Sequence, residues 1–352
     1  MYIEFTWIYN KKYFFLSLAS FFIFVFISIF FSIDILYSFK RLLLLIFIII
    51  TILLSLSSFT DKEIKQFIYK ASIFGSLIFY LFNILLFMTW LGHLNIDSNI
   101  INLNPDYIAY FIPRLGGFSA DVNRGIVILI MYTFFLFSHK NKRPFIYIII
   151  GLNILFIFAS LSRTAIVFFI ITLALYYILF ATKKERISIV ILFPISLIVL
   201  FNIANFYSDN NIIDVQSAFE ERLNLDDFSH DTSTGIHFKL IDEGIRIAFS
   251  DIKIFIIGCG YGVSNKIIKG FAMSRNKTAN FHSQYLSILV ENGVFAFLAF
   301  ISIAIILPVT KYRNRLLPLI VGLFCFNIFY ELTNEPMYWF TLLYYYKFND
   351  LA

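Results

Sequence analysis

The chain has 352 residues, of which 60% are hydrophobic and 14% are charged, and its formal net charge is +6. A soluble globular domain carries roughly 25% charged residues, so this composition excludes a chain that is mostly solvated. The basic residues cluster in short polar segments between apolar runs. This distribution is typical of membrane-protein loops and does not resemble a basic groove for nucleic acid. We therefore predict an all-α, polytopic membrane helix bundle.

Long apolar runs follow one another along the chain. A membrane-spanning helix needs about 20 apolar residues to cross a hydrocarbon core of about 30 Å. Such runs predict about ten spans, which must be helical because lipid offers no hydrogen-bond partner to a free backbone group. We expect residues 1–352 to form one integral membrane domain, with spans near residues 13–33, 42–59, 69–91, 123–138, 145–160, 164–182, 187–206, 283–309, 315–332 and 336–347.

Lysines and arginines are distributed unevenly between the two sides of this membrane domain. Cytoplasmic loops collect positive charge, so the richer side is predicted to be cytoplasmic and to hold both termini. The loops at 92–122 and 207–282 then face outward, and the Lys40–Arg41 pair departs from the pattern. The richer side holds Lys11, Lys12, Lys62, Lys65, Lys70, Lys140, Lys142, Arg143, Lys183, Lys184, Arg186, Lys311, Arg313, Arg315 and Lys347.

Three arginines lie at the outward ends of predicted spans. Arg114 is in the 92–122 loop beside two glycines, Arg124 is at the head of the fourth span, and Arg163 is in a turn too short to leave the interface. An ionised arginine at this depth extends to the headgroups, pairs with a carboxylate or lines a functional cavity. The guanidinium fork matches phosphate oxygens. These arginines would therefore suit a lipid-linked phosphate or pyrophosphate.

The outward loop at 207–282 is the only sizeable polar region. It is predicted to contain an amphipathic helix over residues 236–247. The glycine-rich segment 258–262 reads as a flexible turn, because no strand precedes it as a dinucleotide-binding motif requires. The apolar side of the helix holds Ile236, Leu240, Ile241, Ile245 and Ala248, and the polar side holds Lys239, Asp242, Glu243 and Arg246.

His282 lies where this loop re-enters the membrane. A histidine here is either satisfied at a helix N-terminus or acts as a general base, because the ordinary imidazole pKa of about 6.5 is close to working pH. Glu291, nine residues on in the same helix, needs a cationic or polar partner at that depth. The sequence contains no phosphate-binding loop and no metal-ligand spacing, so we expect no cofactor and no metal.

Three segments together resemble the O-antigen polymerase and O-antigen ligase family of bacterial inner membranes. They occur in order within residues 110–300, with one long outward loop between the first and the last. The segments are Ser162-Arg163-Thr164-Ala165, the loop segment Asp231-Thr232-Ser233-Thr234-Gly235 continuing to Gly258-Cys259-Gly260-Tyr261-Gly262, and His282-Ser283-Gln284-Tyr285-Leu286 through Glu291-Asn292-Gly293.

Two further features bear on this resemblance. Arg114, followed by ten residues and Gly125, is similar to an arginine-loop pattern of the polymerases. Relatives often carry an arginine shortly after the Ser/Thr run, where this chain has Gly235-Ile236-His237. Either Arg246 or His237 is the candidate replacement for that second phosphate-binding arginine.

The resemblance implies a multi-helix glycosyltransferase of the GT-C type. Such an enzyme transfers glycan from an undecaprenyl-pyrophosphate carrier at the periplasmic face of the inner membrane, without a nucleotide sugar or metal. In this scheme Arg163 and Arg114 neutralise the pyrophosphate, and His282 accepts the proton of the acceptor hydroxyl. Arg124, Arg246, His237 and Glu291 are further candidates for substrate binding.

The resemblance leaves more than one activity open. We favour a polymerase that joins lipid-linked repeat units, and the alternative within the family is a ligase that uses lipid A–core as acceptor. From a different class, a flippase would need polar groups along the middle of several helices, but stretches such as 42–54 and 187–200 are nearly free of charge. The expected partners are the lipid-linked oligosaccharide and membrane lipid. The resemblance leaves open whether a chain-length regulator protein binds, and no nucleic acid is expected.

Overall fold

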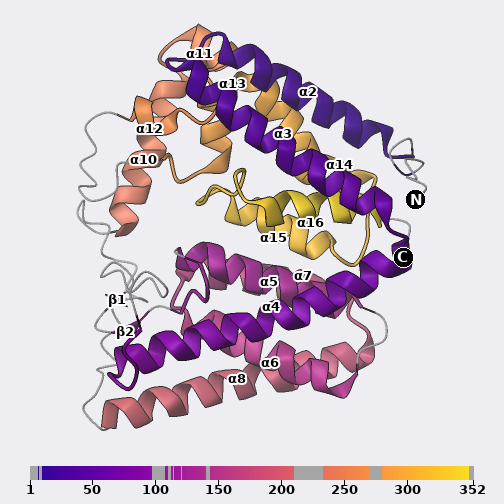
Figure 1. The fold of residues 1–352 in the computed structure, drawn as a ribbon, viewed down its shortest axis with the longest axis vertical. Helices are drawn as coiled ribbons and strands as arrows, with labels where there is room; N and C mark the ends of the chain where they lie inside the picture. Colours follow the sequence, from indigo (N-terminus) through magenta and orange to yellow (C-terminus); the bar gives the residue numbers. More distant parts are fainter. Residues whose placement is uncertain are drawn as a thin grey trace. The chain divides into compact units, whose positions relative to one another are not determined.

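The computed structural model describes residues 7, 10–96, 108–109, 112–113, 115–119, 121–139, 143–209, 233–268 and 280–348. Figure 1 shows that these residues are almost entirely helical. The elements are α2 (Lys12–Ile29), α3 (Ile35–Ser58), α4 (Asp61–Trp90), β1 (Ile108–Ala109), β2 (Ile112–Pro113), α5 (Val122–Ser138), α6 (Pro144–Ala159), α7 (Arg163–Leu179), α8 (Lys183–Asp209), α10 (Ser233–Ala248), α11 (Ile252–Ile257), α12 (Ser264–Ile267), α13 (Gln284–Ile301), the π-helical turn η2 (Ser302–Ile306), α14 (Leu307–Thr310), α15 (Leu317–Phe326) and α16 (Pro336–Lys347).

The predicted all-α membrane bundle is confirmed, since a helix lies in each predicted span. The large polar loop at 207–282 contains the short helices α10, α11 and α12, as expected. Shorter apolar helices run over Val122–Ser138, Pro144–Ala159, Arg163–Leu179 and Leu317–Phe326. The helices long and apolar enough to cross a membrane, by length and composition, are Lys12–Ile29, Ile35–Ser58, Asp61–Trp90 and Gln284–Thr310. The chain is therefore a polytopic helical membrane protein.

The predicted span at 315–332 is too long at its C-terminal end. Helix α15 ends at Phe326, and the chain then folds back to contact the first residue of α13. The Gln284 amide donates to the carbonyl oxygens of Asn327 and Tyr330. The side-chain oxygen of Gln284 accepts a hydrogen bond from the Leu332 amide at 2.8 Å. These buried bonds satisfy backbone groups that a continued helix would have satisfied internally.

The chain divides into two compact units, Met1–Thr60 with Asp227–Ala352, and Asp61–Asp226. In the first unit, α2 packs along α13 and α16 packs on α3. The rings of Phe14 on α2 and Tyr346 on α16 stack with centroids 3.9 Å apart. In the second unit, α4 packs on α5 and α6 on α8.

Polar side chains inside the second unit bond to one another across three helices. The Tyr80 hydroxyl on α4 donates to the Ile149 carbonyl oxygen at 2.9 Å and also contacts Asn153 on α6. The Asn153 amide donates to the Thr133 hydroxyl of α5 at 3.0 Å. Such interhelical bonds help membrane helices to associate, because lipid offers the groups no alternative partner.

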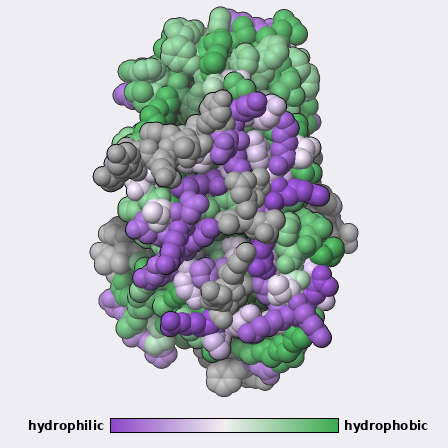
Figure 2. All heavy atoms as spheres, turned by 90° about the vertical axis from the view of Figure 1, so that its right-hand side faces the viewer, coloured by the Kyte–Doolittle hydropathy of each residue, from purple (hydrophilic) through white to green (hydrophobic). Residues whose placement is uncertain are grey.

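Within each unit, cations from the predicted cytoplasmic loops contact aromatic rings of other elements at one end of the helices. In the first unit, the Lys11 ammonium lies 5.1 Å from the Tyr312 ring centroid. In the second, Lys184 lies 5.5 Å from the Tyr147 centroid. Figure 2 shows hydrophilic residues on the face it views. The side of the membrane on which these loops lie stays a prediction.

Candidate functional site

The first group of predicted site residues lies where α5 and α7 begin. Ser162 caps α7, because its hydroxyl accepts a hydrogen bond from the Ala165 amide. The same hydroxyl donates to Oδ1 of Asn123 at 2.5 Å. Asp121 caps α5 by accepting hydrogen bonds from the amides of Asn123 and Arg124. Side-chain contacts therefore join the two helix N-termini directly.

Arg124 and Arg163 stand at these two N-termini. Arg163, the first residue of α7, is half-exposed and makes no hydrogen bond or ion pair within the described part of the chain. Arg124 is also half-exposed, and it has interactions inside the protein. A helix N-terminus carries partial positive charge and unpaired amide donors, which favour anions. Two adjacent N-termini with two guanidinium groups make a place suited to phosphate oxygens.

Arg114 lies outside the described residues, but the chain immediately after it packs closely on α4 and α5. Gly117, at a φ of +65°, donates its amide to Oδ1 of Asn83 at 2.8 Å. A Cβ on Gly125 would lie 2.0 Å from the carbonyl oxygen of Gly116. The arginine-loop pattern that ends at Gly125 therefore has a packing reason, since the loop rests against the first turn of α5.

His282 belongs to the other unit and lies two residues before Gln284, the first residue of α13. Its side chain is half-exposed, and its amide donates to Oδ1 of Asn280 at 3.1 Å. Its φ of 48° lies in the left-handed region, which is uncommon for a residue other than glycine. Strained backbone of this kind persists where surrounding contacts hold it, and it concentrates at functional sites. The geometry therefore keeps His282 a candidate for chemistry.

Glu291 has the polar partners that its depth in α13 requires. Its carboxylate accepts hydrogen bonds from the Gly262 amide at 2.8 Å, the Ser264 amide at 2.9 Å and the Ser264 hydroxyl. The side chain is buried, and α13 is broken two residues later at Gly293, whose φ is 77°. Through these hydrogen bonds Glu291 holds the glycine-rich loop against α13, next to the break at Gly293. Its predicted contact with substrate stays a prediction.

The backbone of the glycine-rich loop lies directly against the backbone of α13 next to its break at Gly293. A Cβ on Gly258 would lie 2.2 Å from the carbonyl oxygen of Glu291, and one on Gly293 would lie 2.2 Å from that of Ile256. Cys259 is buried in this contact, and burial together with the Glu291 charge raises the pKa of its thiol to about 12. Since the thiolate is the reactive form, Cys259 is unsuited to be a nucleophile.

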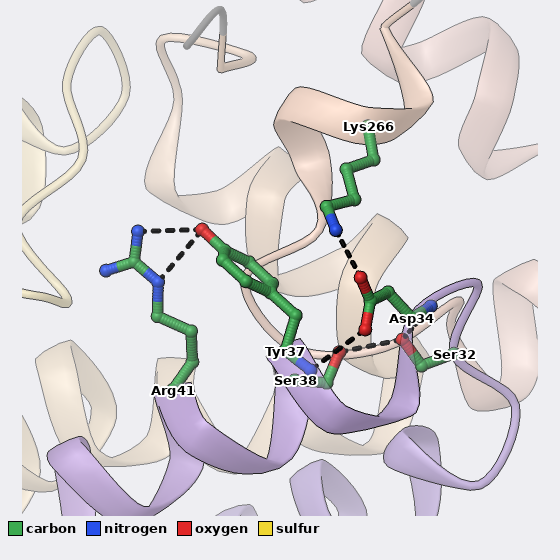
Figure 3. A network of polar contacts seen from close by, with 6 residues as sticks. All are labelled: Ser32, Asp34, Tyr37, Ser38, Arg41 and Lys266. Carbon is green, nitrogen blue, oxygen red and sulfur yellow. Dashed lines mark hydrogen bonds and ion pairs between the residues drawn. The ribbon is translucent and has the colours of Figure 1, made fainter.

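Figure 3 shows a polar network that the sequence reasoning missed, at the connection between α2 and α3. Asp34 caps α3 through the Tyr37 amide and forms an ion pair with Lys266 of α12. The Lys266 contact lowers the pKa of the exposed Asp34 carboxyl. Arg41 donates two hydrogen bonds to the Tyr37 hydroxyl, at 3.1 and 2.9 Å. The sequence signal that could have pointed to this network is the Lys40–Arg41 pair, which departs from the uneven distribution of lysines and arginines.

The two candidate replacements for the second loop arginine are placed differently. The Arg246 side chain is exposed and forms an ion pair with Glu243 one helical turn away. This guanidinium lowers the pKa of the Glu243 carboxyl. The side chain of His237 lies outside the described residues.

The described site residues thus form two sets, Arg124 with Arg163 in one unit and Arg246, His282 and Glu291 in the other. That His282 shares a cavity with Arg163 and Arg114 stays a prediction.

Residues 146–301 match the family model described as O-antigen ligase. The matched region contains Arg163, the large loop, His282 and Glu291, and it begins after Arg114 and Arg124. No curated protein and no solved structure matches the chain.

Proposed function

From the premise that residues 146–301 belong to the O-antigen polymerase and ligase family, we propose that this chain is a glycosyltransferase of surface-polysaccharide synthesis. It joins repeat units carried on undecaprenyl pyrophosphate, at the periplasmic face of a bacterial inner membrane, with both termini in the cytoplasm. The observation that carries the proposal is Arg163, a half-exposed guanidinium at two joined helix N-termini that makes no hydrogen bond or ion pair with the residues that the structure describes.

The donor's pyrophosphate is the ligand that this place suits. Pyrophosphate gains negative charge as the bond to the sugar breaks. Preorganised donors aimed at developing charge stabilise the transition state, because they need no reorganisation during the reaction. Arg163 and Arg124 supply such donors, at two helix N-termini whose partial positive charge favours an anion. Arg114 from the adjoining loop completes the set in this proposal.

The acceptor side of the reaction is assigned to His282. A hydroxyl oxygen of the acceptor sugar attacks the anomeric carbon of the donor glycan, and the bond from that carbon to the pyrophosphate oxygen breaks. The hydroxyl proton passes to the imidazole, and undecaprenyl pyrophosphate leaves with the bonding electron pair. A positioned histidine can accept this proton near neutral pH. The half-exposed side chain at the head of α13 favours this role over a core position.

The ligase is the second candidate, since the matched family model is described as O-antigen ligase. The two activities share the donor and differ in the acceptor. Deleting the chromosomal gene and separating the surface polysaccharide by electrophoresis distinguishes them. We expect core bearing a single repeat unit, as loss of a polymerase leaves. Core without any repeat unit would establish the ligase instead, and accumulation of inward-facing lipid-linked units would establish a flippase.

Arg163 provides the sharpest test of the donor site. We expect Arg163→Ala to lower the rate of polysaccharide synthesis by about 10²–10³-fold, as removal of one oxyanion donor does. Arg163→Lys should be impaired less, because it keeps the charge but loses the fork of donors. The measurement is synthesis in membranes that contain equal amounts of each variant.

The matched control for this test is Arg186→Ala. Arg186 belongs to the same unit but stacks on Tyr177 at the predicted cytoplasmic end, with its guanidinium 5.4 Å from the ring centroid. Arg186→Ala should leave the rate of polysaccharide synthesis unchanged. A normal rate in Arg163→Ala would contradict the phosphate assignment. The thermal stability of Arg163→Ala should equal that of the unaltered protein, because Arg163 makes no hydrogen bond or ion pair among the described residues.

A further inference from the structure

Helix α10 of the large loop presents three different surfaces around its axis. The first faces the protein: Leu240 and Ala248 are fully buried, and Gly244 lies so close to Phe281 that a Cβ would be 2.9 Å from its ring. The second is charged and holds Lys239, Asp242, Glu243 and Arg246. An amphipathic helix that only covered a soluble core would need no third surface.

The third surface is apolar and exposed. Phe238 is 49% exposed, and Ile245 and Phe249 are 44% and 66% exposed. Ile245 and Phe249 follow Phe238 by seven and eleven residues. At 3.6 residues per turn these are about two and three full turns, so the three side chains form one stripe along the helix. Exposed apolar residues continue into α11 with Ile252, which is 71% exposed, and Ile256. The structure divides the predicted apolar side of this helix, because Leu240 and Ala248 are buried and Ile245 is exposed.

This apolar surface adjoins the exposed end of α2. The Lys253 ammonium of α11 lies 4.8 Å from the Phe31 ring centroid, just beyond the end of α2. Phe30 and Phe31 are themselves exposed, and α2 is a candidate membrane span. Helix α11 also contacts α2 and α13 directly. Figure 1 shows α10 running across the direction of α2 and α3, near the ends of these helices at α11.

We propose that α10 and α11 lie in the membrane plane, with the surface of Phe238, Ile245, Phe249, Ile252 and Ile256 immersed in the outward leaflet. The occupant of this surface is lipid, because the surface continues the exposed apolar end of a spanning helix. Amphipathic helices with cations beside an apolar face bind the interface in this way, about 5–10 Å into the headgroup and acyl boundary. Lys239, Arg246 and Lys253 are placed to meet lipid phosphates.

This arrangement fixes the depth of His282 in the membrane. The buried side of α10 packs against Phe281, the residue before His282, through Gly244. Anchoring α10 at the interface therefore holds the head of α13 at the level of lipid phosphates. The membrane contact itself does not rest on the proposed enzymatic function.

The test uses the purified full chain in nanodiscs that contain brominated phospholipids. Phe249→Trp adds a fluorophore on the proposed lipid surface, and Glu243→Trp adds one on the charged surface of the same helix, about 120° around the axis from position 249. The three native tryptophans form a common background that the unaltered protein measures. We expect bromines near the upper acyl chain to remove most of the emission added by Phe249→Trp and little of that added by Glu243→Trp. Aqueous acrylamide should have the opposite preference.

A second variant separates immersion from local packing. In the Phe249→Trp protein, Ile252→Asp should release α11 and sharply lower the quenching by brominated lipid, while thermal unfolding stays cooperative. Equal bromine quenching at positions 249 and 243 would overturn the proposal. So would shielding of Phe249→Trp from both quenchers, because protein, from this chain or a second copy, would then cover the surface.

Discussion

Replacement of His282 by alanine is expected to lower the rate of polysaccharide synthesis by about 10²–10⁴-fold, the usual contribution of positioned proton transfer. The reason is that no other group is assigned to accept the proton of the attacking hydroxyl. Binding of the lipid-linked donor should survive, because the arginines hold the pyrophosphate in the proposed scheme. Synthesis and donor binding are measured on the same membranes, with the amount of protein made equal.

The left-handed backbone at His282 allows a well-matched control. Asparagine tolerates a φ near 48° better than most residues, and it keeps a hydrogen-bonding side chain without being a base. A proton-accepting role predicts that His282→Asn is as inactive as His282→Ala. If His282→Asn retained full activity, the histidine would serve only to shape the start of α13. Normal synthesis by His282→Ala would reject the assignment altogether.

Replacement of Gly258 by alanine is expected to cause a large loss of stability. The new Cβ would lie 2.2 Å from the Glu291 carbonyl oxygen and 2.5 Å from the Asn292 amide nitrogen, at a φ of +87°. Overpacking costs about 1–3 kcal/mol, and a φ of 87° with a ψ of −176°, a backbone conformation open essentially to glycine alone, adds about 1–3 kcal/mol. Because backbone atoms cannot rotate away, the glycine-rich loop must separate from α13 and lose the hydrogen bonds to Glu291.

Thermal unfolding in detergent, followed by size-exclusion chromatography, measures this effect. Gly92→Ala is the control, because Gly92 has a similar φ of +77° but a Cβ there would meet no atom within 4 Å. Gly258→Ala should lower the midpoint temperature more than Gly92→Ala, because only the Cβ at position 258 meets the backbone of α13. Equal midpoints would mean that the loop does not pack on the break in α13 as described.

The helices could be predicted well from the apolar runs, and the site only in part. Motif resemblance pointed to Arg163 and His282, and the structure gives each a distinct local setting. The partner of Glu291 was expected to be polar but could not be named, because the donors at 262 and 264 lie nearly thirty residues away in the chain. The ion pair of Asp34 with Lys266 joins residues still further apart.

The amino-acid sequence by itself determined that this chain is a helical membrane protein and where most of its apolar helices lie. Each helix satisfies its own backbone, so in lipid an apolar run of sufficient length is enough to specify it. Only the tertiary structure decided that α13 breaks at Gly293, that Ser162 joins α7 to α5, and which side of α10 is exposed. These features depend on contacts between segments remote in the chain. Periodicity separates apolar from polar faces, but it cannot tell an apolar face packed on protein from one left open.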